Sequence, residues 1–184
     1  MNLEARFARL EARVEIRELV ARYCFAVDAR DVPGMADCFT HDGSFRSIDG
    51  AMDATGRDAV IDQFHTRFAV LGPSNHFTHD QLIIFDDDDA SRATGLVNAH
   101  AEVVRNGSAM WTSLRYHDEY RHEYGKWRFK VRALEFFYYL RPADYADAML
   151  GVLRNHAYRT PHAADFPEAL SSWRTYYEEH PRAT

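Results

Sequence analysis

The sequence predicts a domain of the α+β class, with N-terminal helices packed on the concave face of a curved antiparallel sheet. Apolar residues recur every three or four positions over most of residues 3–71, which is the spacing found on the buried side of a helix. From Asn75 onward the apolar period changes to two, which is typical of strands. Short connections such as Asn106-Gly107 join these strands, so successive strands must pair antiparallel. Helices followed by such a meander define the α+β class.

The N-terminal part is predicted to hold three helices. The first covers residues 3–29, and a second, short helix has Asp31 as its N-cap and ends near Phe39. A short strand over residues 44–48 precedes the third helix, which covers residues 57–71. The apolar residues of the first helix that are expected to face the core are Leu3, Phe7, Leu10, Val14, Leu19, Val20, Tyr23 and Val27.

The remainder is predicted to form a four-stranded meander and a tail. The strands are expected at residues 76–85, 93–104, 109–124 and 126–138. A helical segment is expected at residues 145–155, and the rest of the tail is polar with a few aromatic residues. We therefore interpret residues 1–141 as one α+β domain and residues 142–184 as a helical arm or lid.

Composition and charge limit the kinds of partner that the protein can have. A chain of 184 residues with 46% apolar and 14% aromatic residues can bury a substantial core. The net charge of -6, without a cluster of Lys or Arg, argues against nucleic acid or an anionic membrane as the main partner. Both cysteines lie in predicted helices, which suggests a reduced compartment rather than a disulfide. No apolar run approaches the roughly 20 residues that span a bilayer, and no apolar leader follows Met1, so we expect a cytoplasmic protein.

Asp28 is the residue of the first helix that most needs an explanation. It follows Val27, where the helix still buries apolar surface, and an unpaired buried charge costs more than the net stability of a domain. Asp28 must therefore be paired, hydrogen-bonded or functional. A purely structural role also fits the sequence, because Asp28 can cap the helix end or pair with Arg22 or Arg30.

Three features of the chain resemble the SnoaL-like branch of the nuclear-transport-factor-2-like superfamily. They are the order of helices before strands, the run from Glu15 to Phe45, and the segment NHFTHDQLIIFDDDDA at residues 75–90. The resemblance covers the chain up to about Leu140. Within this branch, the pattern resembles the group that includes scytalone dehydratase, bile-acid 7α-dehydratase and hexachlorocyclohexane dehydrochlorinase. The resemblance implies a cone-shaped sheet whose open mouth faces the helix junction.

The resemblance also implies that Asp28 and His76 form a general-base dyad. They match the family's aspartate at the end of the first helix and its histidine at the start of the first long strand. A carboxylate that accepts the Nδ1 proton fixes the imidazole tautomer and leaves Nε2 to take a substrate proton. The alternative is that His76 only packs at a strand edge. The chain departs from the family at Asp80, where Asn is usual, and it has no clean counterpart of a second catalytic histidine.

Two further residues are catalytic candidates. Tyr23 matches a tyrosine that the bile-acid enzyme carries five residues before its aspartate. On an ideal helix it lies about 140° around from Asp28, so it either reaches the cavity to polarise an oxygen or is a core tyrosine. His100 shares one strand face with Asn98 and Glu102. If that face points inward, His100 is a second acid or base, and if it points outward, the row is the solvated side of the sheet.

Four aromatic residues and one arginine are candidates for substrate binding. Aromatic rings line apolar pockets, although sheet cores use the same residues. An arginine at the rim can bind a carboxylate or phenolate, although a solvated arginine is more common. These candidates are Trp111, Tyr116, Phe136, Tyr138 and Arg141. We expect neither a metal nor a cofactor, because His76 and His79 point to opposite faces of a strand and no paired thiolates have zinc spacing.

Together these features predict a cofactor-independent lyase of the dehydratase type that acts on a small hydrophobic ring substrate of polyketide, steroid or aromatic type. An isomerase or cyclase for the same substrates fits equally well, because all these reactions begin with the same proton abstraction. A non-catalytic module that binds a small molecule is the alternative from another class, since this fold hosts many such proteins. We expect a homodimer or homotrimer, because another subunit commonly covers the exposed sheet face in this fold.

Overall fold

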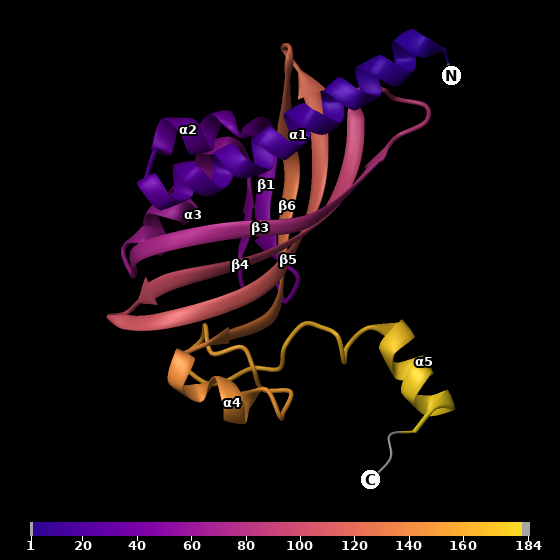
Figure 1. Ribbon diagram of the computed structural model, residues 1–184. Helices are drawn as coiled ribbons and strands as arrows, with labels where there is room; N and C mark the ends of the chain where they lie inside the picture. Colours follow the sequence, from indigo (N-terminus) through magenta and orange to yellow (C-terminus); the bar gives the residue numbers. More distant parts are fainter. Residues whose placement is uncertain (1, 182–184) are drawn as a thin grey trace.

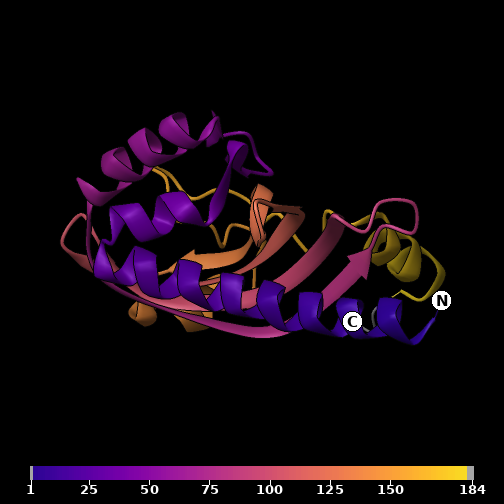
Figure 2. The same cartoon turned by 90° about the horizontal axis from the view of Figure 1, so that it is seen from above.

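Three helices lie in the hollow of one curved sheet in the computed structural model, which describes residues 2–181 (Figures 1 and 2). This arrangement confirms the predicted α+β class. Within the described residues the sheet has six strands in the order β2-β1-β6-β5-β4-β3. The elements are α1 (Leu3–Ala29), α2 (Val32–Asp37), β1 (Phe39–Ser47), β2 (Asp53–Thr55), α3 (Arg57–Phe68), β3 (Leu71–Phe85), β4 (Arg92–Arg105), β5 (Ser108–Glu123), β6 (Lys126–Leu140), the 3-10 helix η1 (Pro142–Asp144), α4 (Tyr145–Ala148) and α5 (Ser171–Glu179).

Helix α1 has the predicted bounds, but only its second half faces the core. That half buries Ile16, Leu19, Val20, Tyr23 and Val27 between the other helices and the sheet. The first half extends along the edge of β3, where Arg9 and Arg13 bond Asp87 and the Ile83 carbonyl. The prediction that Leu3, Phe7, Leu10 and Val14 face the core is therefore wrong, because the side chains of these four residues are 57–78% exposed.

The antiparallel meander β3–β6 is confirmed, with two differences at its margins. Helix α3 ends at Phe68 and strand β3 begins at Leu71, because Leu71 already pairs with Arg105 of β4. Strand β1 joins the sheet beside β6 and runs parallel to it. The register aligns His76, Ala101, Thr112 and Tyr139 in one row across β3, β4, β5 and β6.

The core fills the space between the helices and the concave face of the sheet. At its centre the Tyr23 ring lies 5.7 Å from the Phe129 ring and 6.2 Å from the rings of Phe39 and Phe64. Burying one such side chain stabilises the fold by about 1.5–3 kcal/mol. This aromatic cluster therefore fixes the second half of α1 against the sheet.

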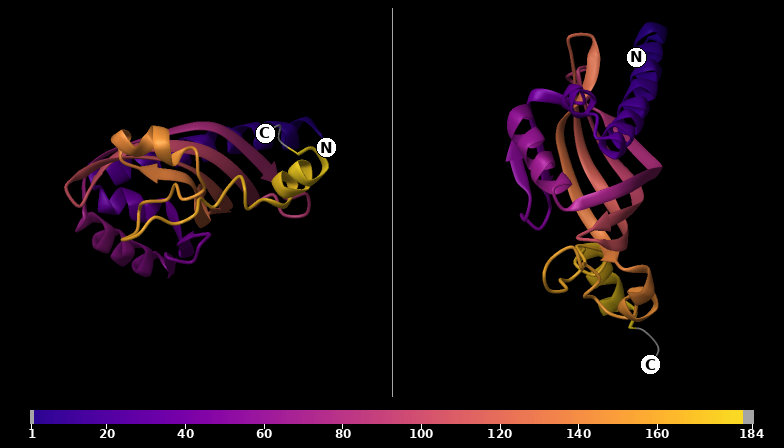
Figure 3. Two further views of the ribbon diagram at one scale, coloured as in Figure 1. Left: turned by 90° about the horizontal axis from the view of Figure 1, so that it is seen from below. Right: turned by 90° about the vertical axis from the view of Figure 1, so that its left-hand side faces the viewer.

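The tail after Leu140 differs from the predicted helix. Only residues 145–148 form α4, and the chain then extends along the edge of β6 that β1 leaves free. There the Tyr139 amide donates to the Arg154 carbonyl at 2.9 Å, and the Phe136 carbonyl accepts from the Asp165 amide at 2.9 Å. The tail lies at the end of the sheet that is remote from α1 (Figure 3). Every helix within residues 2–181 is too short or too polar to cross a lipid bilayer.

Candidate active site

The structure brings Asp28 and His76 into direct contact. Asp28 lies in the last turn of α1 and His76 lies in the first half of β3. The Asp28 Oδ1 atom is 2.6 Å from His76 Nδ1, and the Asp28 Oδ2 atom accepts from the His76 backbone amide at 2.8 Å. Both side chains are mostly buried, with 17% and 14% exposure. With Nδ1 donating to the carboxylate, the neutral imidazole presents Nε2 as an acceptor.

Ser74 and Arg30 support this pair. The Ser74 hydroxyl donates to Asp28 Oδ1 at 2.7 Å. The Arg30 guanidinium bonds the Ser74 hydroxyl at 3.1 Å and the Gly72 carbonyl at 2.5 Å, and it forms no ion pair with Asp28. Arg30 is the left-handed residue that ends α1, so the helix terminus and the start of β3 are held together by its side chain. The Asp28 carboxylate therefore bonds His76 and Ser74 rather than Arg30.

These contacts decide the protonation state of Asp28. Burial alone would raise the pKa of its carboxyl group. The hydrogen bond and charge of His76, the Ser74 hydroxyl and the His76 amide outweigh burial and lower the pKa below its usual range. The group is therefore an ionised acceptor at neutral pH, which is what orienting an imidazole requires.

A small pocket, which we call the inner pocket, opens in front of His76. Its free volume is about 30 Å³, which is roughly the space of one water molecule. Its walls are Tyr23, Val27, Phe64, Arg67, Phe68, Leu71, Ser74, His76, Val103, Thr112, Leu114, Tyr116, Leu134, Phe136 and Tyr139. The pocket is thus lined mainly by apolar and aromatic side chains with a few polar groups, as in sites for small hydrophobic molecules.

Two buried tyrosines of the inner pocket stack against a buried ion pair. The Arg132 guanidinium lies 4.4 Å from the Tyr23 ring and 4.0 Å from the Tyr116 ring. Its Nε and Nη2 atoms bond the two oxygens of Asp118 at 3.0 and 2.9 Å. Burial raises the pKa of both phenols, so both are neutral hydroxyl groups.

Arg67 is a cation of the inner pocket that the sequence analysis did not select. It comes from α3, and its guanidinium lies over the rings of Phe45 and Phe64 at 5.4 and 5.8 Å. Its Nη1 atom contacts Met52 Sδ, whereas its buried Nε atom has no partner among the described residues. No carboxylate of residues 2–181 lies within ion-pairing distance of it. A partly buried cation without a counter-ion favours an anionic or strongly dipolar ligand.

The structure brings together only part of the predicted set. Tyr23, Tyr116 and Phe136 line the inner pocket with His76. His100 lies on the opposite face of the sheet, where its ring stacks on His79 and its Nδ1 atom is 2.6 Å from His79 Nε2. The cause is register, because His76 pairs with Ala101 while His100 pairs with Phe77.

Trp111, Tyr138 and Arg141 also lie outside the inner pocket. The rings of Trp111 and Tyr138 contact Tyr145 of α4 at 6.4 and 5.5 Å. Arg141 forms an ion pair with Asp144 at 2.7 Å. A bulge in β6 explains the position of Tyr138, because Ser113 pairs with Tyr138 while Leu114 pairs with Phe136. Tyr139 therefore takes the inward position that strict alternation assigns to Tyr138.

Comparison with known proteins identifies the family. A profile of the SnoaL-like domain matches residues 8–133, so the chain belongs to the SnoaL-like family, within the nuclear-transport-factor-2-like superfamily. The resemblance predicted from the sequence is thereby confirmed. No curated protein matches the chain.

Solved structures share the fold. A protein from Novosphingobium aromaticivorans, provisionally named scytalone dehydratase, is 17% identical with a TM-score of 0.69, over 88% of this chain and 98% of that one. Hexachlorocyclohexane dehydrochlorinase LinA-type3 from Novosphingobium barchaimii is 18% identical with a TM-score of 0.64, over 72% and 91% of the two chains. A protein of unknown function from Mycobacterium tuberculosis is 26% identical with a TM-score of 0.62, over 75% and 78%.

Proposed function

We propose that the protein is a cofactor-independent lyase of the dehydratase type, with His76 as general base and Asp28 as its orienting carboxylate. The observation that carries this proposal is the 2.6 Å contact between Asp28 Oδ1 and His76 Nδ1 at the wall of a mainly apolar pocket. The names of the structurally similar proteins, a dehydratase and a dehydrochlorinase, support an elimination. The apolar and aromatic walls support a small hydrophobic ring substrate of polyketide, steroid or aromatic type.

In this mechanism His76 Nε2 removes a proton next to a carbonyl or a leaving group. Asp28 stabilises the imidazolium that forms, because it is already ionised and bonded to Nδ1. The neutral hydroxyl of Tyr23 or Tyr116, together with the Arg67 guanidinium, stabilises the negative charge that develops on the substrate oxygen. The electron pair then expels the leaving group, and the proton on His76 neutralises it. His100 has no role in this scheme, because it lies on the other face of the sheet.

A ring substrate requires the inner pocket to widen. A free volume of about 30 Å³ is much smaller than the sites of roughly 300 Å³ or more that hold drug-sized ligands. Arg67 lines the pocket and contacts Met52, and both side chains are unbranched and have several rotatable bonds. We propose that their displacement opens the pocket to the substrate.

Two alternatives share parts of this site. Isomerisation or cyclisation of the same substrates begins with the same proton abstraction and needs no further residue. A non-catalytic module that binds a small molecule is favoured by one observation, the small free volume in front of His76. The lyase, isomerase and cyclase hypotheses all require the protein to remove a proton from its ligand, whereas a non-catalytic module does not.

Proton exchange tests this difference without the natural substrate. We expect the protein to catalyse hydrogen/deuterium exchange at the α-carbon of some members of a panel of cyclic ketones and β-hydroxy ketones, measured by mass spectrometry. The exchange should disappear in His76→Ala and in Asp28→Asn. Binding of these ketones without exchange, unchanged in both variants, would establish the non-catalytic alternative.

We also propose that the chain forms a homodimer or homotrimer. The exposed stripe Leu3, Phe7, Leu10 and Val14 on α1 is a contiguous apolar surface of the kind that marks protein interfaces. Light scattering coupled to size-exclusion chromatography measures the mass directly, and a monomer at micromolar concentration would contradict this proposal. The expected cytoplasmic location stays a prediction.

A further inference from the structure

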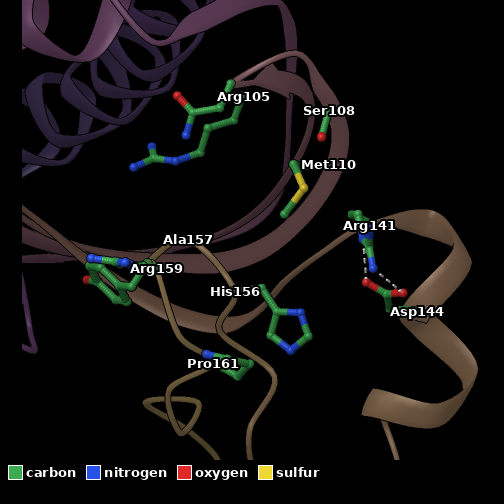
Figure 4. Close-up of a pocket in the computed structure, with 11 residues that line it drawn as sticks. Arg105, Ser108, Met110, Arg141, Asp144, His156, Ala157, Arg159 and Pro161 are labelled. Carbon is green, nitrogen blue, oxygen red and sulfur yellow. Dashed lines mark hydrogen bonds and ion pairs between the residues drawn. The ribbon is translucent and has the colours of Figure 1, made fainter.

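A second cavity lies at the end of the sheet, between the β4–β5 hairpin and the tail. We call it the outer pocket, and its volume is about 780 Å³. One wall comes from the hairpin and carries Arg105 and Met110, and the facing wall comes from the tail and carries His156 and Pro161 (Figure 4). The tail wall lies beyond residue 133, where the match to the SnoaL-like family ends. The outer pocket therefore needs both the hairpin and the tail.

The outer pocket continues the face of the sheet that lines the inner pocket. Val103 lines the inner pocket, and the next residue of β4 on the same face, Arg105, lines the outer one. On β5, Thr112 lines the inner pocket, and Met110, two residues away on the same face, lines the outer one. His76 and Tyr139 lie in the row of Ala101, and Arg105 is four residues further along β4, which is about 13 Å. One elongated molecule can therefore reach both pockets along this face.

The outer pocket is positively charged in a chain whose net charge is -6. Its walls hold three arginines and one aspartate, and that aspartate, Asp144, is paired with Arg141. Arg105 and Arg159 form no ion pair with any carboxylate of residues 2–181. Two guanidinium groups without a carboxylate partner in one concave site match a carboxylate or phosphate group, which each can bind through two parallel hydrogen bonds.

Arg105 also connects the outer pocket with the inner one. Its guanidinium lies 5.9 Å from the ring of Tyr139, a wall residue of the inner pocket. Burial raises the pKa of the Tyr139 hydroxyl, while the charge and hydrogen bond of Arg105 act against this rise. The two groups are therefore in direct electrostatic contact across the boundary between the pockets.

We propose that the outer pocket binds an acidic group, a carboxylate or a phosphate, at the end of a chain on the substrate whose ring enters the inner pocket. Arg105 and Arg159 hold this group, and the ring lies in front of His76. This inference rests on the proposed function for the identity of the ring, but the binding of the acidic group does not require that His76 act as a base. The substrate class becomes an amphipathic one, with an apolar ring and an anionic chain.

Paired ligands test the proposal. The probes are α-tetralone, the same α-tetralone bearing a butanoate chain, and inorganic pyrophosphate, each titrated calorimetrically into the full chain at low salt. We expect the butanoate derivative to bind at least tenfold more tightly than α-tetralone, and this advantage to shrink at higher salt. The advantage should be lost in Arg105→Gln and Arg159→Gln, and partly restored in Arg105→Lys. Arg6→Gln removes an equal charge from the exposed first half of α1 and should retain the full advantage.

The possible results distinguish a failure of the anion subsite from a failure of the proposed base. Equal affinity for the two tetralones, or an advantage that persists in both glutamine variants, overturns the inference. Tight binding of pyrophosphate without any advantage of the butanoate chain also overturns it, because the pocket then serves a free anion. If His76→Ala leaves proton exchange intact while Arg105→Gln abolishes the butanoate advantage, the proposed base is wrong and the anion subsite stands.

Discussion

Asp28 holds His76 at two points, because one carboxylate oxygen contacts the ring at Nδ1 and the other accepts from the backbone amide of the same residue. The position of the imidazole along β3 and its orientation toward the inner pocket therefore depend on one side chain from α1. A carboxamide at this position can replace only part of this arrangement, since its nitrogen donates rather than accepts.

We expect Asp28→Asn to reduce catalysed proton exchange by about 10²- to 10⁴-fold, the range that general-base catalysis contributes. The amide of residue 28 cannot stabilise the imidazolium or fix the reactive tautomer. Exchange rates by mass spectrometry give the size of the loss. Ser74→Ala, which removes one supporting bond and leaves the carboxylate on His76, is the matched control and should retain most of the activity. Equal losses in the two variants would contradict the assigned role of Asp28.

The same carboxylate predicts how stability depends on pH. The pKa of Asp28 is lowered in the folded protein, so its ionised form favours folding. This contribution is present above the ordinary carboxyl pKa of about 3.9 and is lost as the pH falls through the lowered value. Urea unfolding should therefore show the free energy of unfolding of the wild type falling faster than that of Asp28→Asn between about pH 5 and pH 3. A difference between the two proteins that does not change with pH would contradict this prediction.

The buried ion pair beneath the tyrosines should be a major determinant of stability. Asp118 and Arg132 have fully buried side chains, and Tyr120 also donates to Asp118 at 2.8 Å. Asp118→Asn leaves the Arg132 charge buried without a counter-ion, and we expect a loss of about 3–5 kcal/mol in the free energy of unfolding. Asp87→Asn breaks an exposed pair with Arg9 and should cost about 1 kcal/mol or less. Similar losses in both variants, measured by urea unfolding, would show that the buried pair has no special role.

The sequence predicted the meander from local turn and strand signals, and it predicted the contact of Asp28 with His76 from the family resemblance. The end of α1 at Ala29, the hairpin at Asn106-Gly107 and the family resemblance at Asp28 and His76 are all visible in short stretches. The inward position of Tyr139 was not predictable, because a β-bulge without a glycine signal exchanges it with Tyr138. Leu3 and Leu19 are sixteen residues apart, which is about 160° around an ideal helix, so the exposed and the buried leucine lie on nearly opposite sides of α1.

The sequence also did not reveal Arg67 as a pocket residue, because nothing in an amphipathic helix pattern distinguishes an arginine that points into a pocket from one in solvent. We expect Arg67→Met to lower kcat/KM for ketone exchange at least tenfold, since the guanidinium favours the negative charge that develops on the substrate oxygen. Methionine has a similar length and keeps the apolar contacts with Phe45 and Phe64. Arg67→Lys keeps the positive charge and should therefore retain more of kcat than Arg67→Met does. Full activity of Arg67→Met with an unchanged Tm would assign Arg67 to packing alone.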